Sequence, residues 1–410
     1  MSFFVCYPMK GYFLFLQSNP KEAVFGLLLT FFSAFGQTFL ISLYVPSILE
    51  TFDLTKTTFG SVYAIATVSA SVLLIRFGPG IDRKRVRPFT LMAVSLLGLS
   101  AVLFGLAYQL YVLGLALIGL RFAGQGLLTH ISMTVMARHF TADRGKAISI
   151  STLGYSFGEM IFPVAITTLI AWMGWRYTSF ASALFILGAT VPLLLLLPVQ
   201  RLDPDLTIAK KGFRESSAFF LTQLKTLKFW ILASTSIYLS FMFTGFFFYQ
   251  LILADEKGWS VEWYTLAFSA YAISRFFFSL FSGSLIDRFT ATNLYPYHLI
   301  PLVVGYSFLA YAKGEWVAPV YLVLAGFTMG SRGTIKTSVF AELYPPEKLG
   351  TIRSLFTMIM VISTATAPVV FGYLLDNGFG FSYLAKFAIW IALAVIVFNI
   401  KILKFRKSSS

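Results

Sequence analysis

The chain has 410 residues and a formal net charge of +15; 57% of its residues are hydrophobic and 12% are charged. A soluble domain carries roughly 25% charged residues, so this composition excludes most soluble folds of similar length. The apolar residues stand in runs of about 18–25, the length of a helix that spans a bilayer. We therefore predict an all-α integral membrane protein, and we assign the excess positive charge to cytoplasmic loops rather than to nucleic-acid binding.

Twelve membrane-spanning helices are predicted along the chain. Residues 1–22 precede them as a cytoplasmic lead-in, because their short apolar patch lacks the small-residue cleavage site of a signal peptide. The predicted spans are 23–46, 58–77, 89–107, 111–137, 147–170, 177–198, 229–254, 263–286, 295–312, 316–341, 354–375 and 381–403. They form two six-helix bundles, 23–198 and 229–403, with a basic cytoplasmic loop at 199–228 between them and a cytoplasmic tail at 404–410.

The distribution of positive charge predicts the orientation. With the N-terminus in the cytoplasm, about 22 of the 32 Lys and Arg residues fall in cytoplasmic segments and about five on the other side. This asymmetry satisfies the positive-inside rule, so both termini are expected to be cytoplasmic. We expect a multi-pass protein of the bacterial inner membrane. Cys6 is the only cysteine, which excludes an intramolecular disulfide.

An internal repeat relates the two bundles. The loop sequences GPGIDRKRVRP (78–88) and GSLIDRFTATN (283–293) both follow an apolar run, and they lie 205 positions apart. Pro163 and Pro368 lie in the fifth and eleventh predicted helices and are separated by the same number of residues. Parallel six-helix repeats of this kind are one of the established plans of transporters.

At these residues the chain resembles the major facilitator superfamily. The G-x-x-x-D-R loop of that family is matched by Gly78, Asp82 and Arg83, with a degenerate copy at Gly283, Asp287 and Arg288. Its helix-4 motif is matched by Arg121, Gly124 and Gly126, whereas Glu159 stands in helix 5 where proline is often found. The resemblance implies two pseudo-symmetric bundles around a central cavity and transport by alternating access.

The resemblance also implies a conformational latch on the cytoplasmic side. Asp82, with Gly78 and Arg83 in the same loop, would face the start of helix 11 near Arg353. By pseudo-symmetry Asp287 and its neighbour Arg288 would face the start of helix 5 near Lys146. An aspartate favours the N-terminus of a helix because of the helix dipole. The alternative is that these charges only determine the topology.

Three residues are predicted to couple transport to protons. Arg121 and Glu159 have similar depths in adjacent predicted helices, so a buried pair is expected, and Glu159 could take up a proton when the pair opens. A static bridge between the helices is the alternative. His130 is a further candidate because its ordinary pKa is near neutral, with hydrogen-bonded packing as the alternative.

The predicted substrate contacts carry mainly positive charge. Arg275 and Arg332 lie deep in helices 8 and 10, where an ionisable residue is costly and therefore points to function. Either guanidinium can clamp a carboxylate or phosphate, and the alternative for Arg275 is a bridge to backbone carbonyls. The polar side chains that complete the predicted site are Gln37, Tyr44, Tyr249 and Gln250.

The leading hypothesis is a secondary transporter that moves a small organic anion together with protons. Its alternative is an exporter that exchanges amphipathic drugs or metabolites for protons. The chain contains no H-E-x-x-H motif and no phosphate-binding loop, which argues against an enzyme or an ATP-driven pump. We expect no cofactor and no metal site, and we expect a monomer whose partners are the anionic substrate, protons and the lipid bilayer.

Overall fold

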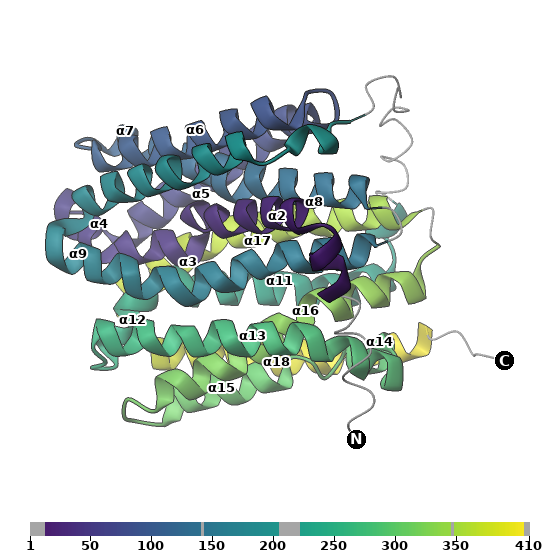
Figure 1. Cartoon of the computed structure of the whole chain (residues 1–410). Helices are drawn as coiled ribbons and strands as arrows, with labels where there is room; N and C mark the ends of the chain where they lie inside the picture. Colours follow the sequence, from purple (N-terminus) through teal and green to yellow (C-terminus); the bar gives the residue numbers. More distant parts are fainter. Residues whose placement is uncertain (1–12, 141–142, 205–221, 346–347, 406–410) are drawn as a thin grey trace. The chain divides into compact units, whose positions relative to one another are not determined.

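A computed structural model describes residues 13–140, 143–204, 222–345 and 348–405 (Figure 1). These described residues form helices and no strand, which confirms the all-α prediction. Within the described residues, eight helices are long and apolar enough to cross a membrane, and the bent pair Pro20–Gly36 and Thr38–Phe52 makes a ninth if it is one span. The count of twelve spans and the orientation of the termini stay predictions.

The internal contacts divide the chain into two compact units. Unit 1 contains residues 1–44 and 66–209, and unit 2 contains residues 45–65 and 210–410. Residues 45–65 therefore cluster with the C-terminal helices, although the sequence places them in the first predicted bundle. The bundle boundaries predicted at 198 and 229 remain a prediction.

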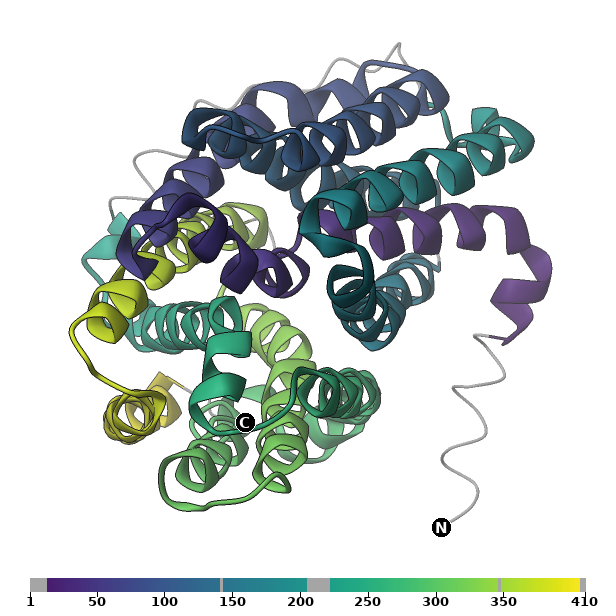
Figure 2. The same cartoon turned by 90° about the vertical axis from the view of Figure 1, so that its left-hand side faces the viewer.

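Unit 1 is a bundle built around one long helical element. Its elements are α2 (Pro20–Phe32), η1 (Ser33–Gly36), α3 (Thr38–Ile41), η2 (Ser42–Tyr44), the second part of α5 (Lys56–Phe77), η3 (Gly78–Asp82), α6 (Val86–Gly105), α7 (Leu110–Leu120), the π-helix η4 (Arg121–Leu128), α8 (Thr129–His139), α9 (Arg144–Leu196) and η5 (Val199–Leu202). Two predicted spans are merged in the 53 residues of α9, which is broken at Gly174, where φ is +78°. Helices α2, α6 and α8 pack against α9 (Figures 1 and 2).

Small residues explain the close packing of α2 on α9. A Cβ atom added at Gly154 would meet the Thr30 hydroxyl and the backbone of α2, and one added at Gly158 would lie 3.2 Å from the Cβ atom of Ala34. In lipid, where water does not drive helices together, such glycines let two backbones approach closely. Gly154 and Gly158 thus have a packing role in this chain.

Unit 2 is made of the C-terminal helices and the short segment that joins them. Its elements are α4 (Val45–Phe52), the first part of α5, α11 (Leu227–Phe248), α12 (Gln250–Glu256), α13 (Val261–Phe289), α14 (Ala291–Leu294), α15 (Ile300–Tyr311), α16 (Val317–Leu343), α17 (Leu349–Asp376), α18 (Phe381–Ile400) and η7 (Lys401–Phe405). Helix α13 packs along α16, α15 contacts α16 and α18, and α11 contacts α17 and α18 (Figure 1). The core of this unit includes Phe229, Val339 and Phe356, all essentially inaccessible to solvent.

The segments outside the predicted spans are described in part. Residues 13–18 of the lead-in are helical, and the Phe15 ring packs against Phe140 with ring centroids 4.8 Å apart. The start of the predicted central loop belongs to unit 1, because η5 packs against α6. Residues 1–12, 205–221 and 406–410, which complete the lead-in, the loop and the tail, lie outside the described residues.

Candidate functional site

In unit 2 the predicted arginines lie on the two helices that pack most closely. A Cβ atom added at Gly330 would collide with the carbonyl oxygen of Arg275, and one added at Gly326 would lie 2.6 Å from the carbonyl oxygen of Tyr271. Gly326 and Gly330 form a small-xxx-small pair, the pattern that lets membrane helices approach closely. The α16 glycines therefore bring the Arg275 turn of α13 directly against α16.

This packing brings together the positive charges of the two helices. Arg275 lies near enough to Arg332 for the two positive charges to repel each other. The same holds for Arg332 and Lys336, which lies one turn further along α16. All three side chains are half-buried. Arg332 also donates a hydrogen bond of 2.7 Å from Nη2 to the Ser240 hydroxyl of α11.

The middle turns of unit 2 hold an excess of positive charge. Among its described helices longer than ten residues, the acidic residues lie only in the terminal turns, at Glu262, Asp287, Glu342 and Asp376. Like charges that approach each other at bilayer depth are unfavourable unless an anion joins them. An anion that accepts hydrogen bonds from Arg275 and Arg332 would relieve this repulsion, so this cluster is the candidate anion site.

Unit 1 contains a broken first helix that packs on a π-helix. The chain leaves the helical conformation at Gln37, with φ −84° and ψ 151°, and Gly36 lies so close to Leu120 and Gly124 that a Cβ atom there would meet backbone. The π-helix η4 begins at Arg121, which is also the start of the family-like helix-4 motif. Single-turn π segments are frequent at functional sites. Gln37, a predicted substrate contact, lies half-buried at this break.

Arg121 stabilises the break in the first helix. Its Nη1 donates to the Gly36 carbonyl at 3.3 Å and lies 3.2 Å from the Thr38 hydroxyl, and the side chain is 3% exposed. The Gly36 carbonyl has lost its helical partner at the break, so a buried donor is needed there. Glu159 is also buried, on the α9 turn that packs against η1. The predicted Arg121–Glu159 proton switch stays a prediction.

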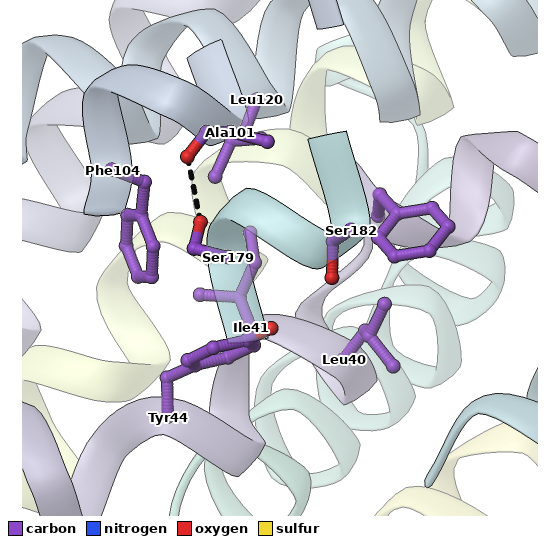
Figure 3. Close-up of a pocket in the computed structure, with 9 residues that line it drawn as sticks. Leu40, Ile41, Tyr44, Ala101, Phe104, Leu120, Ser179 and Ser182 are labelled. Atoms are coloured by element: carbon purple, nitrogen blue, oxygen red, sulfur yellow. Dashed lines mark hydrogen bonds between the residues drawn. The ribbon is translucent and has the colours of Figure 1, made fainter. Parts of the chain in front are cut away.

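Tyr44 lines a small cavity in unit 1 (Figure 3). The lining residues are Phe35, Leu40, Ile41, Tyr44, Ala101, Phe104, Leu120, Ser179 and Ser182. Its volume of about 20 Å³ is enough for one water molecule rather than for an organic substrate. The Ser179 hydroxyl donates to the Ala101 carbonyl at 2.6 Å (Figure 3). A substrate contact for Tyr44 stays a prediction.

The first predicted latch loop, residues 78–88, is stabilised by contacts within unit 1. Arg138 Nη1 lies 3.4 Å from the Asp82 carboxylate and donates to the Ile81 carbonyl, while its Nη2 donates to the Leu202 carbonyl at 3.0 Å. The His130 ring lies beside Gly78 and interacts electrostatically with Asp82. His130 is therefore part of the surroundings of the first predicted latch loop. Arg83 is exposed. The sequence analysis missed Arg138, although its place at the end of the fourth predicted helix made it a possible partner.

The second latch loop is built differently. Asp287 and Arg288 are exposed at the end of α13, where Thr290 has φ +64°. Glu342 of α16 accepts hydrogen bonds from the backbone nitrogens of Ala291 and Thr292 and so caps α14. Lys146 contacts Asp143 at 2.7 Å in unit 1, and Arg353 is exposed near the start of α17. The predicted Asp82–Arg353 and Asp287–Lys146 contacts would join the two units and stay predictions.

Tyr249 connects three segments of unit 2. Its hydroxyl lies 2.8 Å from the carbonyl oxygens of Lys56 and Pro368, and the side chain is fully buried, as is that of Gln250. Nearby, Asp376 accepts hydrogen bonds from the Lys56 and Thr57 nitrogens and lies 3.6 Å from Lys56 Nζ. The sequence analysis did not single out Lys56 or Asp376, because both lie in short polar connections. The predicted substrate contacts of Tyr249 and Gln250 stay predictions.

The described residues form a helical bundle in which eight helices are long and apolar enough to cross a membrane, which is the architecture of an integral membrane protein. The sequence profile of the Major Facilitator Superfamily matches residues 26–265 and 230–409. The chain belongs to this superfamily and is a multi-pass membrane protein.

Two proteins with similar sequences come from fungi. The "Aspyridones efflux protein apdF" of Emericella nidulans is 25% identical over 80% of this chain, and the "MFS transporter asaE" of Aspergillus flavus is 23% identical over 61%. The matched regions span 66% and 55% of these relatives, so the chain covers less than two thirds of their length. The predicted bacterial inner membrane therefore stays a prediction.

Solved structures show the same fold. A bacterial homolog of the human lysosomal transporter Spinster superposes with a TM-score of 0.67 at 16% identity, covering 95% of this chain and 98% of that one. The nucleoside transporter NupG gives a TM-score of 0.70 at 14% identity, covering 94% of this chain and 98% of that one. At such identities the likeness establishes the fold alone.

Proposed function

We propose that the protein is a twelve-helix secondary transporter that moves a small organic anion by alternating access, coupled to protons. The observation that carries this proposal is that Arg275 and Arg332 lie in the middle turns of the closely packed helices α13 and α16, near enough for their charges to repel each other. A guanidinium group offers a planar fork of donors that matches a carboxylate, and two forks from different helices can hold one anion. Membership of the superfamily supports transport as the activity.

Coupling to protons is assigned to unit 1. Glu159 is 7% exposed on α9, close to the η1 break that Arg121 stabilises. Protonation of a buried carboxylate changes the charge beside that break, which gives a physical route from proton binding to helix movement. Glu159→Gln should therefore leave anion binding intact and remove the stimulation of uptake by an inward proton gradient.

The test is uptake of labelled mono- and dicarboxylates into vesicles that contain the purified protein. Arg275→Ala and Arg332→Ala should each weaken anion binding about 100-fold, the usual cost of removing one side of a charged contact. Arg201→Ala, at an exposed position of η5, is the matched control. Absence of gradient-dependent uptake of any anion, or equal effects of all three substitutions, would refute the proposal.

A second candidate function is export of amphipathic compounds in exchange for protons. One relative is named as an efflux protein, which favours an outward direction. This candidate predicts that cells expressing the protein become resistant to toxic amphipathic compounds. Resistance without anion uptake would favour export over the leading proposal.

A further inference from the structure

An aromatic cluster lies beside the two arginines of unit 2. The Tyr271 ring is 5.1 Å from the rings of both Phe247 and Phe268 and 5.7 Å from that of Phe243. Phe243 and Phe247 lie closer still, with centroids 3.8 Å apart. Four rings from α11 and α13 thus form one continuous cluster.

The cluster and the arginines share the same helix faces. Tyr271 precedes Arg275 by four residues on α13, so their side chains lie one above the other. On α11, Ser240 precedes Phe243 by three residues, and Ser240 accepts the hydrogen bond of Arg332. The charge of Arg332 also interacts with Tyr271. Arg275 and the Ser240 partner of Arg332 therefore lie on the same helix faces as the rings of the cluster.

One ring of the cluster is accessible. Phe247, Phe268 and Tyr271 are at most 3% exposed, whereas Phe243 is half-buried, as are both arginines. Helix α11 is the most enclosed of the eight apolar helices, with 78% of its span buried. The half-buried Phe243 ring contacts the buried rings of Phe247 and Tyr271, so it lies at the accessible edge of the cluster. The accessible groups are one aromatic ring and two cations.

We propose that the transported anion is an aromatic carboxylate whose ring packs on Phe243 while its carboxylate lies between Arg275 and Arg332. This inference rests on the proposed function and specifies its substrate class. Aromatic rings pair favourably beyond the area they bury, and a guanidinium group binds both a carboxylate and a ring face. Phe247, Phe268 and Tyr271 hold the Phe243 ring in place and determine specificity by positioning it.

The probes are three small compounds that separate charge from aromaticity. Benzoate and cyclohexanecarboxylate have the same number of carbons and the same charge, but only benzoate is planar and aromatic; benzamide is aromatic and neutral. Binding to the full-length protein in lipid nanodiscs is measured at equilibrium by competition with labelled benzoate. We expect benzoate to bind about fivefold more tightly than cyclohexanecarboxylate, and benzamide to bind far more weakly than either.

Substitutions on α11 then test the assigned ring. Phe243→Leu should abolish the preference for benzoate and leave the affinity for cyclohexanecarboxylate within about twofold. Phe243→Tyr keeps a ring and should keep the preference. The matched control is Phe241→Leu, a half-buried position on the same helix whose ring contacts Phe371 at 5.9 Å; it should also keep the preference.

The outcomes separate this inference from the proposed function. Equal binding of the two carboxylates to the unaltered protein, or equal losses in Phe241→Leu and Phe243→Leu, would overturn the aromatic site while anion transport stands. If no carboxylate binds, or if Arg275→Ala leaves carboxylate binding unchanged, the proposed function itself is overturned. If only Phe243→Leu loses the preference for benzoate over cyclohexanecarboxylate, the result supports both the aromatic site and the proposed anion transport.

Discussion

At the scale of single residues, two aspartates with matching sequence contexts have different surroundings. Asp82 lies 3.4 Å from Arg138, whose guanidinium also binds two backbone carbonyls of unit 1. Asp287 is exposed, and the neighbouring turn is capped by Glu342 instead. A partly buried carboxylate beside an arginine makes a larger contribution than an exposed one. We therefore expect the two loops to differ in function.

This difference predicts unequal effects of neutralising the two aspartates. Asp82→Asn should slow transport several-fold, because Arg138 loses its counter-charge and the loop loses its fixed position. Asp287→Asn should have a smaller effect. Initial uptake rates in vesicles, normalised to folded protein, measure both. Equal and negligible effects would leave both loops with the role of topology markers only.

Arg176 provides a second residue-scale prediction, on stability. It donates to the carbonyls of Gly105 and Ala107 at the end of α6 and lies 4.3 Å from the rings of Tyr108 and Trp175. Arg176→Gln should lower the free energy of unfolding by about 2 kcal/mol, since hydrogen bonds to charged donors are lost. Thermal unfolding in detergent measures it, with exposed Tyr177→Phe as the control. A midpoint shift no larger than that of the control would contradict this role.

At the scale of helices, the extent of an element was easier to predict than its internal breaks. The third span was expected at 89–107 and α6 covers Val86–Gly105, because an apolar run determines a spanning helix. The break at Gln37 could not be predicted, since it depends on a donor from Arg121 in another helix. Arg275 and Arg332 stood out as charges in apolar runs. Ser240 and Tyr271 did not, because their role comes from the packing of α11, α13 and α16.

The glycines of α16 give a prediction at this scale. Gly330→Ala should push α13 away from α16, because the new methyl group meets the Arg275 carbonyl, and anion affinity should fall with the displaced guanidinium. Gly333→Ala on the same helix is the control and should leave anion affinity unchanged, because no atom lies within 4 Å of a Cβ atom added there. Alanine also favours the helix over glycine by about 1 kcal/mol. Benzoate binding and thermal stability measure both. Similar affinities in the two variants would contradict the role of Gly330 in positioning Arg275.

At the scale of the whole molecule, the single cysteine offers a direct test of orientation. Cys6 lies in the predicted cytoplasmic lead-in. A membrane-impermeant maleimide should therefore leave Cys6 unlabelled in intact cells and label it after the membrane is permeabilised. Control variants carry one added cysteine at Lys313 or at Lys348, expected outside and inside, in a Cys6→Ser background. Labelling of Cys6 in intact cells would reverse the predicted orientation.

Residues 45–65 give the last prediction, because they lie in the first predicted bundle and yet cluster with the C-terminal helices. Two hydrogen bonds attach them to the C-terminal helices: the Tyr249 hydroxyl donates to the Lys56 carbonyl, and the Asp376 carboxylate accepts from the Thr57 nitrogen in the first turn of α5. Helix α5 then continues into unit 1. If the first part of α5 moves with unit 1 during alternating access, this attachment opens in each cycle. Cross-linking K56C to D376C with a short, reducible thiol reagent in a Cys6→Ser background should stop transport and leave benzoate binding measurable. Reduction should restore transport, and each single variant treated alone should stay active. Undiminished transport with the cross-link in place would show that the attachment is a permanent part of unit 2, so that α5 does not change partners during transport.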